Sequence, residues 1–182
     1  RLPITTKTLY LKVNGKNLTG NSPKVERGTT VQLCASCNAK DVTVTFSILK
    51  TGETTPITLT EPSYSSGKYT KDYSFDTIGE YTIYFTATKD GYTVQSAEKK
   101  LTVTKPNLSN AEITFPYGNE AAFNSVSATG VPMFVVTYNG TKLEENVDFV
   151  ITSGDSTYDV GPCTLTIKAT DNGDYTGSKS AE

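Results

Sequence analysis

The stretch Asp76-Thr-Ile-Gly79-Glu-Tyr81-Thr-Ile83-Tyr-Phe85 decides the fold. An acidic residue, a glycine and a tyrosine stand directly before a run in which apolar and polar residues alternate. Strict alternation predicts a strand with one buried face. A tyrosine at the start of such a strand is typical of a tyrosine corner, in which its hydroxyl bonds to backbone a few residues upstream. We therefore expect Asp76, Gly79 and Tyr81 to have structural roles.

Similar alternation runs through the surrounding sequence as far as residue 104. About seven short alternating segments, separated by turn residues, are typical of an immunoglobulin-like β-sandwich. The apolar positions lie in segments 9–13, 31–35, 42–48, 57–59, 69–75, 81–87 and 101–103. Asn14-Gly15 and Lys89-Asp90-Gly91 predict tight turns between strands. We expect residues 1–105 to form one sandwich domain.

The chain length leaves room for a second domain. Its 182 residues approach twice the roughly 100 residues of one sandwich. Pro106 has no N–H to give to a ladder, so the last strand of the first domain should end before it. Residues 106–182 then form a smaller β domain, with a two-residue hairpin turn at Asn139-Gly140. Because no segment keeps a 3.6-residue period, we expect an all-β protein with almost no helix.

Short motifs follow one another through the second domain at fairly specific spacing. They are Val136-Thr-Tyr-Asn139-Gly140-Thr-Lys-Leu143 with Asp148-Phe149, then Asp159-Val-Gly161, Leu165-Thr-Ile167, and Gly173-Asp-Tyr175-Thr-Gly177. In this order they resemble a bacterial Ig-like repeat over residues 108–182. Pro162 and Asp174 depart from the pattern, where threonine and asparagine are common. The first domain resembles bacterial Ig-like or PKD-like modules more loosely, through its corner motif and the Lys89-Asp90-Gly91-Tyr92 turn.

The resemblance implies a place outside the cell. Such repeats occur in tandem in secreted and cell-wall-attached bacterial proteins, where they act as spacers, stalks or adhesive units. It therefore implies a non-catalytic structural or adhesion segment at a bacterial surface. The alternative function is a module whose first domain binds a carbohydrate or a host protein through loops or exposed tyrosines.

Composition argues against several function classes. The chain has no histidine, the commonest general base and metal ligand, and its net charge is -2 without a basic run. A carboxylate pair is the catalytic route that remains, but the acidic residues sit mostly in turns. No apolar run approaches the roughly 20 residues that span a bilayer. We predict no enzyme, no catalytic residue, no cofactor, no metal, no nucleic-acid partner and no membrane insertion of this segment.

Cys34-Ala-Ser-Cys37 is the motif that comes nearest to chemistry. A redox pair opens a helix in thioredoxin-like enzymes, whereas this pair follows a strand; a zinc site needs further ligands. We therefore favour structural or incidental thiols. A local disulfide needs the strand to have bent by Ala35, since residues three apart in an extended strand lie about 10 Å apart. Cys163 shares a predicted strand face with Leu165 and is interpreted as a buried thiol.

Two kinds of binding residue remain open. Eleven tyrosines offer stacking surfaces for a sugar, and those at polar or loop positions are Tyr10, Tyr64, Tyr84 and Tyr158. The loops 155–159 and 171–174 contain the oxygen donors that calcium prefers, but Asp, Asn and Gly are also ordinary turn formers.

The sequence also predicts a shape and a context. Pro106 restricts its own backbone and biases Lys105 toward an extended conformation, and Leu108 could pack into the junction. These features predict an elongated monomer. Because the chain stops at Ser180-Ala181-Glu182, where strand-like sequence is about to begin, we interpret it as a segment of a longer protein.

Overall fold

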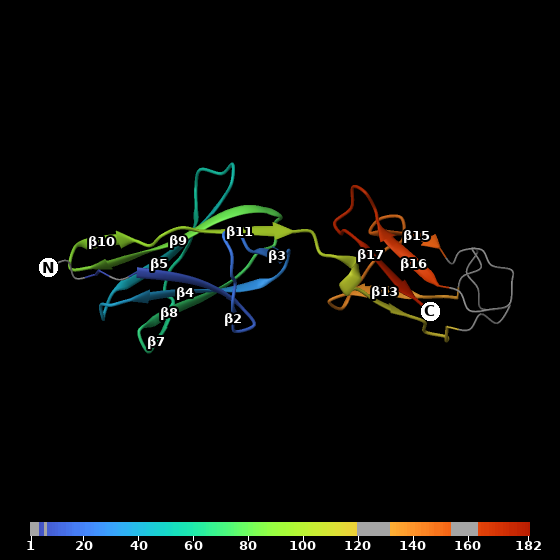
Figure 1. The fold of residues 1–182 in the computed structure, drawn as a ribbon, viewed down its shortest axis with the longest axis horizontal. Coiled ribbons are helices and arrows are strands. Elements are labelled where there is room, and N and C mark those ends of the chain that lie inside the picture. Colours follow the sequence, from blue (N-terminus) through green and yellow to red (C-terminus); the bar gives the residue numbers. More distant parts are fainter. Residues whose placement is uncertain (1–3, 6, 120–131, 154–163) are drawn as a thin grey trace. The chain divides into compact units, whose positions relative to one another are not determined.

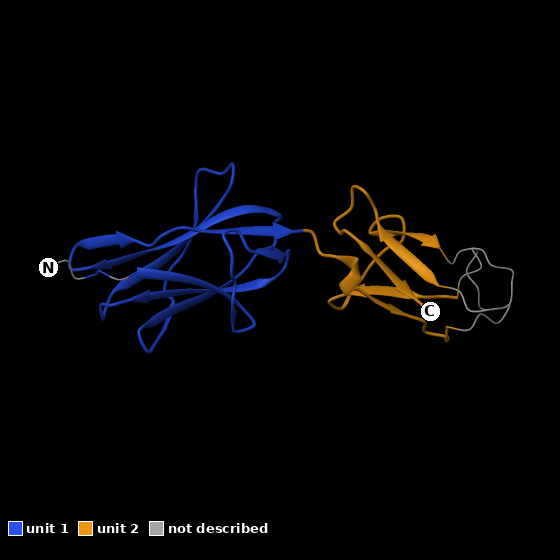
Figure 2. Ribbon diagram, viewed as in Figure 1, with its two compact units in different colours: residues 1–104 blue, residues 105–182 orange. Residues whose placement is uncertain are grey.

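Nearly all of the regular secondary structure that the protein forms is β-strand. The computed structural model describes residues 4–5, 7–119, 132–153 and 164–182. The chain divides into two compact units, residues 1–104 and 105–182 (Figures 1 and 2). In the described ranges, every regular element is a strand except the short 3-10 helix η1 (Leu108–Asn110). The all-β prediction is confirmed.

Unit 1 is an immunoglobulin-like sandwich of two sheets (Figure 1). One sheet has the order β2-β1-β4-β8-β7, and the other has the order β3-β11-β9-β5-β6 with β10 also paired to β9. The strands are β1 (Lys7–Val13), β2 (Lys16–Asn17), β3 (Lys24–Glu26), β4 (Thr30–Cys37), β5 (Thr43–Lys50), β6 (Ile57–Leu59), β7 (Ser63–Ser65), β8 (Lys68–Ser74), β9 (Gly79–Lys89), β10 (Tyr92–Gln95) and β11 (Lys99–Thr104).

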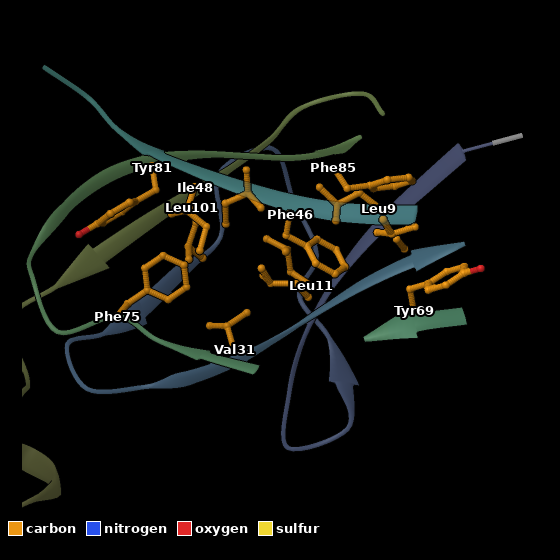
Figure 3. Close-up of a cluster of buried hydrophobic side chains, with 14 of the residues drawn as sticks. Leu9, Leu11, Val31, Phe46, Ile48, Tyr69, Phe75, Tyr81, Phe85 and Leu101 are labelled. Atoms are coloured by element: carbon orange, nitrogen blue, oxygen red, sulfur yellow. The ribbon is translucent and has the colours of Figure 1, made fainter. Parts of the chain in front are cut away.

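Alternate residues from both sheets fill the core of unit 1 (Figure 3). On β9 the buried positions are every second residue from Tyr81 to Ala87, as the alternation predicts. Phe46 on β5 and Phe85 on β9 are both fully enclosed, and their rings meet edge to face at 6.1 Å. The same period-2 pattern that predicted the strands therefore also identifies the residues that hold the sheets together.

Tight hairpin turns set the register of several strands. Asn14 and Gly15 have φ of 49° and 76°, and Asp90 and Gly91 have φ of 50° and 79°. Two successive positive φ values define the type I′ turn, whose twist matches that of the flanking strands. Both turns were predicted from sequence. Ser66-Gly67, between β7 and β8, has the same geometry and was not predicted.

A β-bulge interrupts the last strand of unit 1. Gln95 on β10 pairs with Thr86, whereas Lys99 on β11 pairs with Ile83, so one side of the ladder has an extra residue. Buried Ser96 fills the irregularity. Its Oγ accepts a bond from the Phe85 N–H at 3.0 Å and donates to the Ala97 carbonyl. The bulge separates β10 from β11 without leaving the Phe85 amide unsatisfied.

In the described residues of unit 1, β3 and β11 form a parallel pairing. The chain leaves β2 in the first sheet and enters β3 in the second, so residues 18–23 cross from sheet to sheet. Lys24 then pairs with Thr102, and Glu26 with Thr104. The first segment to enter this sheet therefore lies beside the last segment to leave it.

The described residues of unit 2 form two three-stranded sheets. One has the order β12-β13-β14 and the other the order β15-β16-β17. The strands are β12 (Glu112–Thr114), β13 (Val135–Tyr138), β14 (Thr141–Lys142), β15 (Phe149–Ser153), β16 (Leu165–Ala169) and β17 (Ser178–Ala181). Asn139 and Gly140, with φ of 47° and 79°, form the predicted hairpin turn.

The segment around Pro106 belongs to unit 2. Its carbonyl accepts the Thr176 N–H at 2.9 Å, and the Leu108 N–H donates to the Thr176 carbonyl at 2.8 Å. Asn107 and Thr176 thereby form a parallel bridge. Leu108 is fully buried in the core of unit 2, with Val136, Phe149 and Ile167. Leu108 thus serves as a core residue, rather than as the junction residue that the sequence suggested.

Gly177 adjoins this bridge and cannot be replaced without cost. Its φ is +76°, and a Cβ there would lie 2.2 Å from Asn107 Oδ1. The same oxygen accepts the Ser109 N–H at 2.9 Å and so begins η1. The glycine of the Tyr-Thr-Gly motif therefore makes room for Asn107, the residue that caps η1.

Candidate functional site

Tyr81 closes the loop between β8 and β9. Its hydroxyl donates to the Thr77 carbonyl at 2.7 Å, which is the tyrosine-corner geometry. Its ring packs edge to face on Phe75 at 5.0 Å, and Figure 3 shows both beside Leu101. Gly79 has φ of +146°, a backbone conformation that L side chains rarely adopt. Asp76 is exposed in the same loop. Tyr81 therefore braces the sandwich, and Gly79 supplies a backbone conformation that the loop needs.

Replacing Tyr81 by phenylalanine should lower the free energy of unfolding of unit 1 by about 0.5–1.5 kcal/mol. The ring contacts remain, but the Thr77 carbonyl loses its donor. Chemical denaturation of the two proteins measures the difference. Tyr92→Phe is the matched control, because Tyr92 is 54% exposed on the edge strand β10. Equal losses in both variants would show that the hydrogen bond does not stabilise the corner.

The two cysteines of the Cys-Ala-Ser-Cys motif point to opposite faces of one strand. β4 continues without a bend through Cys37, and both thiols are free. Cys37 packs against the core, whereas Cys34 pairs with Tyr10 and Thr70 on the outer face. The bent geometry that a local disulfide requires is absent from this strand, so that alternative is wrong here. Cys163 lies outside the described residues.

Burial raises the pKa of four groups in unit 1. These are the thiols of Cys34 and Cys37 and the phenols of Tyr69 and Tyr81. Desolvation is the main cause in each, and at Cys34 the nearby Lys12 and Lys68 oppose it in part. A raised pKa keeps a thiol protonated and makes it a poor nucleophile and metal ligand. The structure thus favours the interpretation of both cysteines as chemically inert.

Unit 1 should lose stability at alkaline pH. The unfolded chain releases these protons near the ordinary pKa values, 9.0 for cysteine and 10.0 for tyrosine, and the folded chain releases them at higher pH. Stability is therefore complete below about pH 8.5 and falls as pH rises through the folded pKa values. Between about pH 6 and 8 it should change little, since no histidine titrates. Urea denaturation across pH 6–10.5 tests this, and a gain in stability above pH 9 would contradict it.

The three candidate sugar-stacking tyrosines that the structure describes lie apart from one another. Tyr10 is 40% exposed on the outer face of β1, opposite Cys34. Tyr64 is 53% exposed on the edge strand β7, where its ring lies 4.8 Å from that of Tyr69. Tyr84 is half-buried on β9, in the other sheet. Tyr158 lies outside the described residues. Any glycan contact would therefore use these side chains singly.

Of the two loops with candidate calcium donors, the structure describes 171–174. The loop 171–174 borders an open hollow of about 480 Å³ with Asp148, and Thr170 Oγ1 donates to the Val147 carbonyl there. Within the described ranges, no three Asp, Glu or Cys side chains converge as metal ligands. The loop 155–159 lies outside those ranges. No helix in the described part of the chain is long and apolar enough to cross a membrane.

Two further cavities lie beside strands. In unit 2, a groove of about 580 Å³ is lined by Met133, Phe134 and Phe149, with Lys142 at its rim. In unit 1, a cavity of about 280 Å³ lies between β1 and β11 and is lined by Leu9, Leu11, Leu18, Tyr10, Lys99 and Lys100. Only Tyr10 among these residues was singled out from sequence. No local signal marks the others, because β1 and β11 are distant in the chain.

No protein-family model matches the chain, and no curated protein does. Among solved structures, a chimeric titin Z1Z2 is 18% identical, with 99% of this chain and 98% of that chain covered and a TM-score of 0.36. The soluble domain of PmoD from a Methylocystis species is 14% identical over 56% of this chain and 96% of that chain, with a TM-score of 0.40. A superoxide reductase from Ignicoccus hospitalis is 14% identical, covering 56% and 82%, with a TM-score of 0.40. These distant similarities do not bear on function, and the fold assignment rests on strand topology.

Proposed function

We propose that the chain is a non-catalytic stalk or spacer segment of a bacterial cell-surface or secreted protein, built to remain folded under tension. The observation that carries this proposal is the parallel pairing between an early and a late segment of each unit. In unit 1 it joins β3 to β11, and in unit 2 it joins Asn107 to Thr176. Extracellular placement follows from the tandem sandwich modules and is part of the proposal.

Parallel pairing matters because of the direction in which force acts. Within unit 1, β1 begins and β11 ends at opposite ends of the sandwich (Figure 1). Once β1 and β2 have detached, a pull on these ends acts along β3 and β11 and shears the slanted hydrogen bonds of this parallel pair. The bonds are then sheared together instead of opening one after another. Forced unfolding depends on the unfolding rate, which such a cooperative barrier slows.

The residue inventory also favours a structural role. The chain has no histidine to act as general base, and desolvation raises the pKa of the Cys34 and Cys37 thiols, which disfavours the reactive thiolate. Among the described candidate tyrosines, Tyr10 and Tyr64 lie on separate strands of one sheet and Tyr84 lies in the other sheet. Turnover in a broad glycosidase and peptidase screen would contradict the non-catalytic part of the proposal.

Single-molecule pulling on both ends of the chain tests the mechanical part. In Thr102→Pro the donor to the Pro23 carbonyl, a bond of 2.9 Å, is lost beside β3, and the unfolding force of unit 1 should fall. The matched control is Thr58→Pro on the short edge strand β6, which the pull does not shear. If both variants unfold at the same force as the parent chain, the parallel pair does not resist tension.

A further inference from the structure

The strand β1 leaves part of one edge open. It pairs with β4 from Lys7 to Lys12, but on its other side the β2 ladder covers only Lys12 and Val13. The last bond on that side runs from the Leu18 N–H to the Leu11 carbonyl at 2.8 Å. Since backbone groups alternate in direction along a strand, Lys7 and Leu9 point theirs the same way as Leu11. Among the described residues, no strand pairs with them there.

The cavity between β1 and β11 lies beside this edge. Leu9, Leu11 and Leu18 give it apolar walls. The crossing segment 18–23 contributes to it between the two sheets, and Lys99 and Lys100 line its side on β11. At about 280 Å³ it is near the lower end of the range for small-ligand pockets, about 300–1,000 Å³. It is large enough for one side chain of a partner and too small for a whole folded element.

The segments around the cavity between β1 and β11 are basic. Residues 7–20 and 99–101 contain five lysines, Lys7, Lys12, Lys16, Lys99 and Lys100, and no aspartate or glutamate. The chain as a whole carries a net charge of -2, so the local excess is not a general property. Lysines on an open edge oppose pairing with a second copy of the same edge. The same charges attract an acidic strand.

We propose that the open edge of β1 binds an extended, acidic peptide segment of a partner protein by strand addition, with one apolar side chain of the peptide in the cavity. The backbone groups of Lys7 and Leu9 supply the hydrogen bonds, as in other cases of β-strand addition. Alternate peptide side chains face the cavity and the solvent. Flanking carboxylates of the peptide meet the ammonium groups of Lys99 and Lys100. This peptide binding is a function in addition to the stalk role and does not depend on it.

The probe is a set of capped, fluorescent hexapeptides Asp-Thr-Φ-Thr-Φ-Asp, where Φ is Val, Ile, Leu, Phe or Tyr. Fluorescence anisotropy should show binding of at least one, and replacing its Asp residues by Lys should abolish it. Lys99→Glu with Lys100→Glu should weaken binding about tenfold or more. Lys68→Glu with Lys71→Glu makes the same charge change on β8, away from the cavity between β1 and β11, and should have little effect on binding.

Amide hydrogen exchange distinguishes strand addition from charge attraction alone. Binding should protect the amides of Lys7 and Leu9, while Thr8 and Tyr10, which face β4, should change little. No binding by any of the acidic peptides would overturn the proposal, as would binding without protection of Lys7 and Leu9. If polygalacturonate binds at Lys99 and Lys100 more tightly than every peptide, the ligand of this cavity is an acidic glycan instead.

Discussion

Replacing Phe85 by alanine is expected to lower the free energy of unfolding of unit 1 by about 3–5 kcal/mol. Phe85 is fully enclosed between the sheets, and its ring meets that of Phe46 at 6.1 Å. The substitution removes apolar contact area and leaves a cavity that two fixed sheets cannot close. A domain of this size has about 5–15 kcal/mol in total, so the unit approaches its stability limit.

Calorimetry with two resolved transitions measures this effect. The transition of unit 2 should stay in place, because Phe85 belongs to a core cluster that contains no residue of unit 2. Thr86→Ala is the matched control on the same strand, facing outward, and should cost less than about 0.5 kcal/mol. A loss for Phe85→Ala similar to that of the control would contradict the placement of Phe85 in the core.

Leu108→Ala should have the reciprocal effect, lowering the free energy of unfolding of unit 2 by about 2–5 kcal/mol. Leu108 is fully buried against the two small sheets of that unit, although it stands in what the sequence presents as a linker. With eight buried residues in the described core of unit 2, the loss of one large side chain is a substantial fraction.

Ser109→Ala tests the same helix turn without touching the core. Ser109 is exposed, and the bond to Asn107 Oδ1 comes from its backbone N–H, which the substitution keeps. We expect a change below about 0.5 kcal/mol. Destabilisation of unit 1 in place of unit 2 by Leu108→Ala would return Leu108 to the role of a junction residue.

Local chemistry made much of unit 1 predictable. Asn14-Gly15 and Asp90-Gly91 favour positive φ at both positions, so the hairpin turns follow from two residues each. Tyr81 and the alternation after it predicted both the corner and the buried face of β9. These predictions hold because each depends on residues that are adjacent in sequence, and the tertiary contacts of unit 1 favour the same local conformations.

The remaining features depend on contacts distant in sequence. β3 has three residues, too few to show a period, and its parallel partner β11 lies far along the chain. The cavity beside β1 likewise combines Leu18 with Lys99. Cys34 and Cys37 show the same limit, since their faces depend on whether β4 bends. Strand topology determines which distant residues come into contact, so no short stretch of sequence contains a pattern that predicts these contacts.

The bulge at Ser96 makes the hairpin of β9 and β10 a natural place for grafting. Because of its extra residue, the pairing of β10 with residues 86–89 of β9 has a different register from the pairing of β11 with residues 79–83. A change in the first pairing therefore leaves Lys99 to Val103 paired with β9. Pairs of residues could be inserted around Asp90-Gly91, or a foreign loop substituted, and β11 would keep its place beside β3. Diversity at this tip is therefore compatible with an unchanged frame, which gives protein engineers and evolution alike a site to vary.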